Sequence, residues 1–410
     1  MKLEDVKISH YKYKVKSMIL TYGKTPNLNK YEVDGNLITR MEIVKNFDGE
    51  IFPFFTVTFS MPNSIYRELI KPKNKNNIKV NLHIQKGKFN ETWKVENYGA
   101  IPFKDCIKGI FHAIIGPKEL DLTEKEQEMI EKSGYEYGQL NTLTMALYPK
   151  DYYDNFQTVI NANLEAVTVT DALVYLLNKA KIKNVLLSPS DNKKKYSQML
   201  LLPIQVHKMI SRLCDKYRFH NKGSIIFFDL DRFYIIDKSV NCTAYTENEY
   251  KLTYIIVSTS SQPTRMIGGS YVDDKKKINV LNCVEISPND NSDITKKVSG
   301  DNIISIDADG NVVKTNKKAT KVTNVVVQNE GSHSAKAIKR SLTESKKIIA
   351  CQLQNEDITM IKPNKSFILS IEGKKYDCYN GKYRLTLASH VFEKEGNYFT
   401  LSSIIHLSAQ

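Results

Sequence analysis

The sequence predicts an α+β fold that is mainly β, with two β-rich halves on either side of a short helical segment. Short apolar or alternating runs, separated by Gly, Asn and Pro, fill the first hundred residues and return after residue 238. Between the halves, residues 168–180 and 203–217 space their apolar side chains three and four apart, as amphipathic helices do. These two periodicities define the predicted fold class.

The chain has 410 residues, more than one hydrophobic core usually supports, so we expect several domains. Residues 1–161 form the first β domain in this division, with a helical excursion near 119–133. Residues 162–240 form a small helix–helix–β-hairpin domain. Residues 241–410 form the second β domain, with a flexible insertion near 285–340.

The first domain contains four clear strand patterns, a short helix and a polar helix. The strands are expected at residues 14–20, 38–44, 54–59 and 78–84. Residues 62–70 have helical spacing after an N-cap candidate, and the Lys- and Asn-rich run 71–77 is interpreted as a turn between strands. In residues 119–133, Thr123 and Glu126 have the spacing of a capping box.

The middle domain begins with a second capping-box pattern at Thr168-Val169-Thr170-Asp171. Pro203 suits the first turn of a second helix, which continues to Tyr217. Residues 223–237 then predict two buried strands around a bend that contains Asp229 and Asp231.

The last domain is expected to contain two hairpins. Residues 303–306 and 312–313 flank Asp309-Gly310, a pair that suits a type I′ turn, and a helix is expected from Ser334 to Leu342. At the C-terminus, Asn380-Gly381 and Glu395-Gly396-Asn397 supply turns around long alternating segments. In that pattern, the alternating residues of one strand are expected to face those of the other: Tyr383, Leu385 and Leu387 opposite Tyr398, Thr400 and Ser402.

The charge composition does not require a nucleic-acid function. The formal net charge is +14, but only eight of the 59 basic residues are Arg, the residue that binds phosphate and guanine through two hydrogen bonds. The excess is Lys, which we interpret as coding bias on solvated surfaces. The six Cys have no C-x-x-C spacing and are expected to be reduced thiols in cytoplasm. No signal peptide and no apolar run of about 18 residues is present.

No residue is assigned a catalytic, cofactor-binding or metal-binding role. The strand that ends in Asp229-Leu230-Asp231 is similar to the motif of phosphatases with an aspartyl nucleophile, but Phe233 stands where that family has Thr or Val. We therefore interpret both carboxylates as structural. His207 and His390 are interpreted as packed or surface residues, and residues 307–310 match only half of a calcium loop.

A motif in the C-terminal hairpin resembles a known family. It has the form Gly-x-Tyr-x-[Leu/Val]…His-x-Phe…Gly-x-Tyr-x-Thr across residues 381–400, after the segment 362–367. It looks like the closing strands of the tube-like barrel in the baseplate hub proteins of phage tails. The order helix, Gln-x-Leu-x-Leu-Pro at residues 198–203, helix and strand pair resembles the middle region of hub and late-control proteins.

The resemblance covers residues 165–237 and 345–410 by motif, and the first hundred only by architecture. It implies two tail-tube-like β-barrel domains joined by the middle domain, and a non-enzymatic homotrimer. Six barrels in three copies would adapt a hexameric tail tube to a trimeric central spike.

The implied partners are the tail tube, central spike, tape measure and baseplate wedge proteins, with DNA only as passing cargo and no membrane insertion. A fused spike or hydrolase is not expected, so those would be separate proteins. The expected location is the virion baseplate, after assembly in the host cytoplasm. Two alternatives stay open: a basic DNA-associated protein of a mobile element, and a hydrolase that uses Asp229 and Asp231.

Overall fold

The computed structural model confirms a mainly β chain with few helices. It describes residues 9–24, 26–75, 77–90, 102–115, 140–239, 242, 249–254, 277–279, 282–286, 303–306, 312–314, 324–327, 348–371 and 374–409. Within this part of the chain, no helix is long and apolar enough to cross a bilayer.

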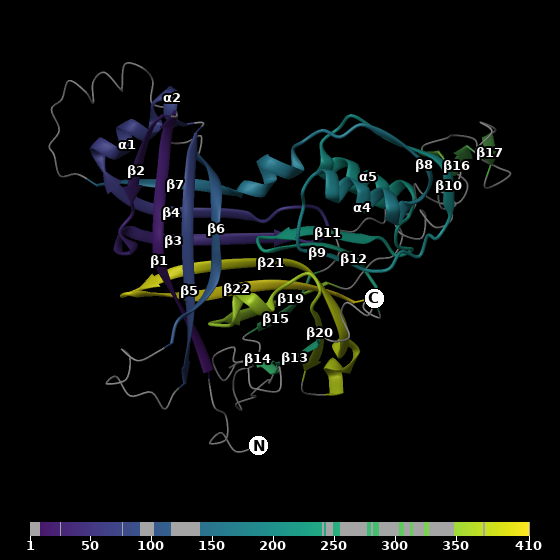
Figure 1. The fold of residues 1–410 in the computed structure, drawn as a ribbon. Coiled ribbons are helices and arrows are strands. Elements are labelled where there is room, and N and C mark those ends of the chain that lie inside the picture. Colours follow the sequence, from purple (N-terminus) through teal and green to yellow (C-terminus); the bar gives the residue numbers. More distant parts are fainter. Residues whose placement is uncertain are drawn as a thin grey trace.

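Eight strands close into a barrel in the order β21–β3–β4–β7–β6–β5–β1–β22, and β22 pairs back to β21 (Figure 1). Every neighbouring pair in the barrel is antiparallel. The strands are β1 (Ser9–Lys24), β3 (Ile38–Asn46), β4 (Phe54–Pro62), β5 (Ile78–Asn90), β6 (Lys104–Ile115), β7 (Leu140–Pro149), β21 (Gly381–Glu395) and β22 (Tyr398–Ala409). A further strand, β2 (Asn27–Glu32), pairs with β1 and with no other strand of the described residues.

The C-terminal hairpin supplies two strands of this barrel, and residues 1–161 supply the other six. β21 pairs with β3 from Leu387 opposite Asn46 to Glu393 opposite Arg40, and β22 meets β1 at Tyr13 opposite Phe399. Figure 1 shows the two long strands of the hairpin running from the barrel into the second half of the molecule. Backbone donors and acceptors are the same in every strand, so local sequence patterns could not predict that β21 pairs with β3 or that β22 pairs with β1.

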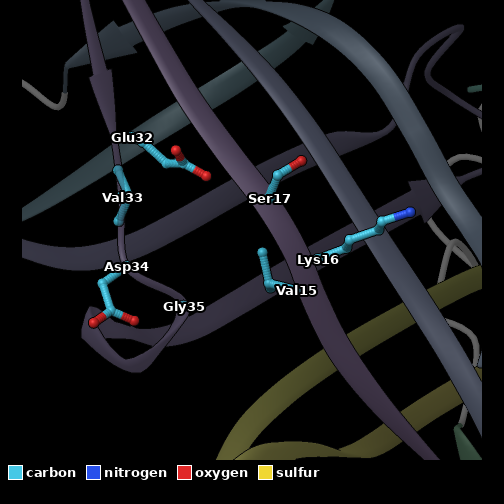
Figure 2. Close-up of a pocket in the computed structure, with 7 residues that line it drawn as sticks. All are labelled: Val15, Lys16, Ser17, Glu32, Val33, Asp34 and Gly35. Atoms are coloured by element: carbon cyan, nitrogen blue, oxygen red, sulfur yellow. The ribbon is translucent and has the colours of Figure 1, made fainter.

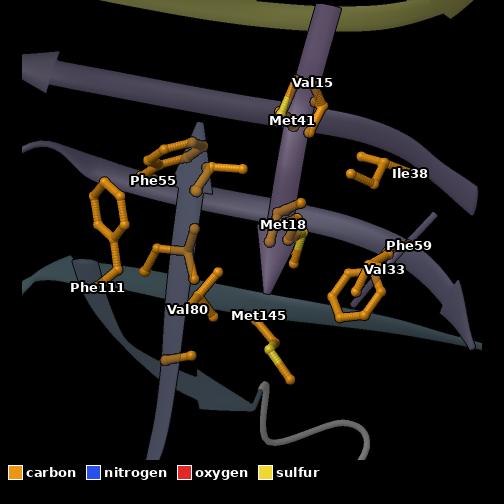
Figure 3. Close-up of a cluster of buried hydrophobic side chains, with 14 of the residues drawn as sticks. Val15, Met18, Val33, Ile38, Met41, Phe55, Phe59, Val80, Phe111 and Met145 are labelled. Carbon is orange, nitrogen blue, oxygen red and sulfur yellow. The ribbon is translucent and has the colours of Figure 1, made fainter. Parts of the chain in front are cut away.

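The barrel interior is a continuous apolar core built by strand alternation. Side chains such as Met18, Met41, Phe55, Val80 and Met145 point inward from five strands and are fully or almost fully buried (Figure 3). Burying each such side chain stabilises the fold by roughly 1.5–3 kcal/mol, before the entropy cost of ordering the chain.

The second half of the molecule extends the same sheet from the two long strands. On one flank, β21 pairs with β20 (Ser366–Ile371), which continues to β13 (Glu249–Tyr254) and β14 (Lys277–Asn279). On the other, β22 pairs with β19 (Ile348–Gln354), which continues to β15 (Asn282–Ile286). The described strands form two flanks of a curved sheet. A second closed barrel stays a prediction, and so do the boundaries of the three domains.

The middle unit contains two helices, a strand pair and a small sheet around its own core. Its elements are β8 (Ala162–Thr168), α4 (Val169–Lys179), β9 (Val185–Leu187), β10 (Lys195–Leu201), α5 (Val206–Lys216), β11 (Ser224–Asp229) and β12 (Arg232–Asp237), preceded by a π-helical turn at Tyr152–Phe156. The capping box is confirmed: Thr168 Oγ1 accepts from the Asp171 amide at 3.2 Å, and Asp171 Oδ2 accepts from the Thr168 amide at 2.8 Å. β11 and β12 form the antiparallel hairpin that the sequence predicted, and β9 joins it in parallel.

Most local predictions in the described residues are confirmed, with two corrections. The short helix is α1 (Asn63–Ile70), but the polar run after it contains a further helical turn, α2 (Pro72–Lys75), where a turn was expected. Asn74 is buried there, and its side-chain amide donates to the Glu68 carbonyl at 2.7 Å, which favours helical geometry. In the C-terminal hairpin Tyr383 lies opposite Ala409, and Tyr398 lies opposite Glu395, so the two tyrosines are at opposite ends of the ladder.

Three short strands form a separate sheet within the stretch expected to be a flexible insertion. β16 (Ile303–Ile306) pairs antiparallel with β17 (Val312–Lys314), which confirms the predicted hairpin, and parallel with β18 (Asn324–Val327). The turn of that hairpin and the helices predicted at 119–133 and 334–342 lie outside the described residues. Five cysteines in the described part of the chain are free thiols: Cys106, Cys214, Cys242, Cys351 and Cys378.

Candidate assembly surfaces and the polar junction

A hairpin over residues 382–402 would, on its own, leave backbone donors and acceptors unpaired at its edges, and its sequence therefore predicts that neighbouring subunits of a ring pair with it. The structure contradicts this prediction. β21 has β20 and β3 on its outer side, and β22 has β1 and β19. Ser403, for example, pairs with His390 on one side and with Leu353 on the other. The hairpin is an internal part of the sheet, so neighbouring subunits cannot add strands along it without breaking the fold.

The two carboxylates of the β11–β12 turn point to different environments. Asp229 is buried, and its Oδ1 lies 2.7 Å from Nζ of Lys45 on β3. Asp231 is exposed, and its Oδ2 lies 3.0 Å from Nζ of Lys362. Leu230 between them has a positive φ of 56°, which turns the chain sharply. Both carboxylates therefore pair with lysines from other segments, an arrangement that supports the structural interpretation.

A buried polar junction lies where the barrel, the middle unit and the segment after β19 meet. It contains Lys45, Asp229, Glu356, His390 and Ser403, all of them almost fully buried. His390 Nδ1 is 2.7 Å from Ser403 Oγ and 3.7 Å from Glu356 Oε1. Burial lowers the pKa of His390, and the nearby Glu356 carboxylate partly opposes this shift. Both Glu356 oxygens are buried without a donor among the described residues.

Backbone contacts hold this junction against β1. The Tyr13 hydroxyl donates to the Glu356 carbonyl at 2.6 Å and accepts from the Ile358 amide at 2.9 Å. Burial is the main cause that raises the pKa of Tyr13 well above its ordinary value, and the charges of Asp357 and Glu356 act in the same direction. The neutral phenol can therefore both donate and accept, which the position requires.

A second ion cluster joins three segments at Asp48, in the loop between β3 and β4. Asp48 Oδ2 is 2.8 Å from Arg384 Nη2, and Asp48 Oδ1 is 2.9 Å from Lys238 Nζ. Burial alone would raise the pKa of Asp48, but the hydrogen bond and charge of Arg384, with Lys238, outweigh it and lower the pKa. Because Arg384 is buried on β21 and Lys238 follows β12, this cluster ties the middle unit to both halves of the sheet.

The sequence does not predict these clusters, because their members lie far apart in the chain. One signal was available: Lys45 stands in phase with Met41 and Ile43, so the alternation of β3 predicts a buried position for it. His390 is fully buried and His207 is half-buried, with its Nδ1 3.0 Å from the Phe156 carbonyl oxygen, which supports packing roles for both. Within the described residues, no group of three potential ligands could hold a metal ion.

The seam between β1 and β2 forms one open groove in the barrel wall. Along the edge of β1 that faces β22 and β2, the described strand pairing ends at Tyr13. It begins again at Met18, whose carbonyl accepts from the Val33 amide at 2.9 Å. A β-bulge between Val15 and Ser17 shifts the register there. Figure 2 shows the resulting groove of about 380 Å³ between β1 and the segment that runs from Glu32 to Gly35.

Two solved tail proteins have folds similar to that of this chain. The tail protein from Neisseria meningitidis MC58 superposes with a TM-score of 0.51 at 10% identity, over 98% of this chain and 97% of that one. The 43 kDa tail protein of prophage MuSo2 from Shewanella oneidensis has a TM-score of 0.48 at 10% identity, over 95% and 97% of the two chains. The sequence matches no curated protein.

The chain therefore has a fold similar to that of a tail protein, the class to which the motif in the C-terminal hairpin pointed. A family model described as "Bacteriophage PBS1 gene 109 protein" matches residues 3–409, and the chain belongs to this family. The resemblance to the hub proteins of phage tails is confirmed by these two findings.

Proposed function

We propose that this protein is a structural component of a phage tail, where it forms the baseplate hub. Family membership and the tail-protein fold support this proposal, and so does the closed barrel. The proposed hub is a homotrimeric ring without enzymatic activity, located in the virion. It adapts a hexameric tail tube to a trimeric central spike.

One observation carries the proposal: the same two strands belong to the barrel and to the second half of the sheet. β21 has β3 and β20 on one flank, and β22 has β1 and β19 on the other. Because strands in a continuous ladder cannot rotate independently, the two curved β units of one subunit keep a fixed spacing. Three such subunits would present six β units at regular intervals, the repeat that a hexameric tube requires.

The proposed partners are the tail tube, the central spike, the tape measure and the baseplate wedge proteins, with DNA passing only as cargo. Ring contacts then involve surfaces other than the C-terminal hairpin. The outer edge of β2 and the groove beside it are candidates, because β2 pairs only with β1 and its residues are mostly exposed. Exposed strand edges are sites at which another chain can add a strand.

Two measurements test the proposal. Light scattering after gel filtration, alone and with the candidate spike protein, should give the mass of three subunits in the complex. Electron microscopy of that complex should show a threefold ring whose inner wall has six similar densities. A stable complex with two, four or six subunits, or absence of the protein from purified virions, would refute the hub assignment.

A further inference from the structure

A second groove of about 690 Å³ lies at the α2 end of the barrel, on the outer surface. Three parts of the chain form it: the β1–β2 turn, the segment from α2 into β5, and the end of β6. Its lining residues are Thr21, Gly23, Lys24, Leu28, Lys75, Asn77, Ile78, Lys79, His112, Ala113 and Ile114.

The groove is cationic. Lys24, Lys75 and Lys79 line it, no carboxylate does, and none of the three forms an ion pair with a carboxylate in the described residues. Burial and the charge of Lys79 lower the pKa of His112, while Asp154, outside the groove, acts in the opposite direction. Lysine ammonium groups left without a counterion at close range attract anionic groups to the site.

The groove is also partly apolar, which limits the kind of anion it suits. Leu28 and Ile114 are exposed to 48% and 46%, although both are large aliphatic side chains. Lys79 lies between Thr21 and His112 in the cross-strand register, so an ammonium group is flanked by two polar side chains on neighbouring strands. With Leu28 and Ile114 in the same lining, the surface offers aliphatic contacts beside ammonium groups.

We propose that this groove binds an acidic protein segment that carries aliphatic side chains, from another protein of the tail. Carboxylates of the segment pair with Lys24, Lys75 and Lys79, and its aliphatic side chains cover Leu28 and Ile114. A nucleic acid fits less well, because the lining has neither Arg for bidentate phosphate contacts nor a Phe, Tyr or Trp ring for base stacking. The proposal rests on the proposed function only in placing the protein in a tail.

Lysine acetylation compared between the free protein and purified tails tests this contact. Lys75 and Lys79 should react about tenfold more slowly in tails, the change that corresponds to about 1.4 kcal/mol of protection. Lys183 and Lys193, exposed on the middle unit, serve as internal controls. A zero-length carboxyl–amine crosslinker should join Lys24, Lys75 or Lys79 to Asp or Glu of a different protein, which identifies the partner.

Three outcomes would overturn the proposal. Equal reactivity of Lys75 and Lys79 in free protein and in tails would show that the groove stays open. Protection that nuclease treatment removes would assign it to nucleic acid. Crosslinks only to carboxylates of this chain would assign it to an intramolecular or self-association contact. Absence of the protein from tails is a separate result, which refutes the proposed function instead.

Charge reversal supplies an independent test in the complete phage. The double substitution Lys75→Glu/Lys79→Glu should reduce incorporation into tails at least about tenfold, because like charges placed together at an interface cost several kcal/mol. Lys183→Glu/Lys193→Glu makes the same change in net charge and should leave incorporation unchanged. Circular dichroism of the purified variants checks their folding. Normal incorporation of a folded Lys75→Glu/Lys79→Glu protein would contradict the inference.

Discussion

Removing either partner of the buried Lys45–Asp229 ion pair is expected to destabilise the protein strongly. Nζ and Oδ1 are 2.7 Å apart, and the two side chains are only 5% and 3% exposed. Lys45→Met leaves the Asp229 carboxylate desolvated without a cation, and breaking a buried pair in this way costs about 3–5 kcal/mol. Asp229→Asn should cost a similar amount, because the buried Lys45 ammonium then has only neutral acceptors, the Asn amide oxygen and the Ile361 carbonyl 3.3 Å away.

The double variant Lys45→Met/Asp229→Asn should be less destabilised than the sum of the two single variants. Neither charge is then left alone in the interior, and a coupling energy of up to about 3 kcal/mol is expected for two residues in direct contact. Urea unfolding followed by circular dichroism gives the four free energies of the cycle. Hydrogen exchange over residues 224–237 checks that the loss begins where the middle unit meets the barrel.

The exposed pair in the same turn is the matched control. Asp231 and Lys362 are 3.0 Å apart, with Asp231 62% exposed, so Lys362→Met and Asp231→Asn should each cost less than about 1 kcal/mol. If the variants at Lys45 and Asp229 cost no more than these controls, or if the cycle shows no coupling, the buried pair does not stabilise the junction and the reasoning fails.

Three further outcomes follow from the described contacts. The pKa of Asp48 is lowered in the folded protein, so its pairing contributes stability that is present above the ordinary pKa of 3.8 and is lost as pH falls through the folded pKa. Asp48→Asn should therefore weaken the loss of unfolding free energy at acid pH, measured by urea unfolding across a pH series. An unchanged pH dependence would contradict the role of the pair with Arg384. Ser403→Pro should cost roughly 3 kcal/mol or more and prevent folding rather than assembly, since Ser403 pairs on both sides; a soluble variant with wild-type circular dichroism would argue against the internal position of β22. Thr168→Ala should lower the free energy of unfolding by about 1 kcal/mol, because it removes the capping box with Asp171. Urea unfolding measures this change, and an unchanged free energy would show that the cap does not stabilise α4.

The elements that the sequence predicted correctly depend on interactions over a few residues. The capping box at Thr168 and Asp171 joins positions three apart, and the turn at Glu395-Gly396-Asn397 needs only a Gly that tolerates positive φ, here 60°. Strand alternation decides which face of β3 or β4 is buried, because the side-chain period is set by the backbone itself. These features depend on the local sequence and do not change with the position of the segment in the fold.

Local patterns in the sequence were enough to predict the mainly β class, the helices α1, α4 and α5, the hairpin of β11 and β12, and the likeness of the C-terminal hairpin to tail hub proteins. The folded chain was needed to show that β21 and β22 close the N-terminal barrel, and that Lys45 meets Asp229 across the junction. Backbone donors and acceptors are alike in every strand, so they do not select a partner. The choice among strand partners, and with it the partner of each buried charge, depends on how the whole set of apolar faces packs into a common core.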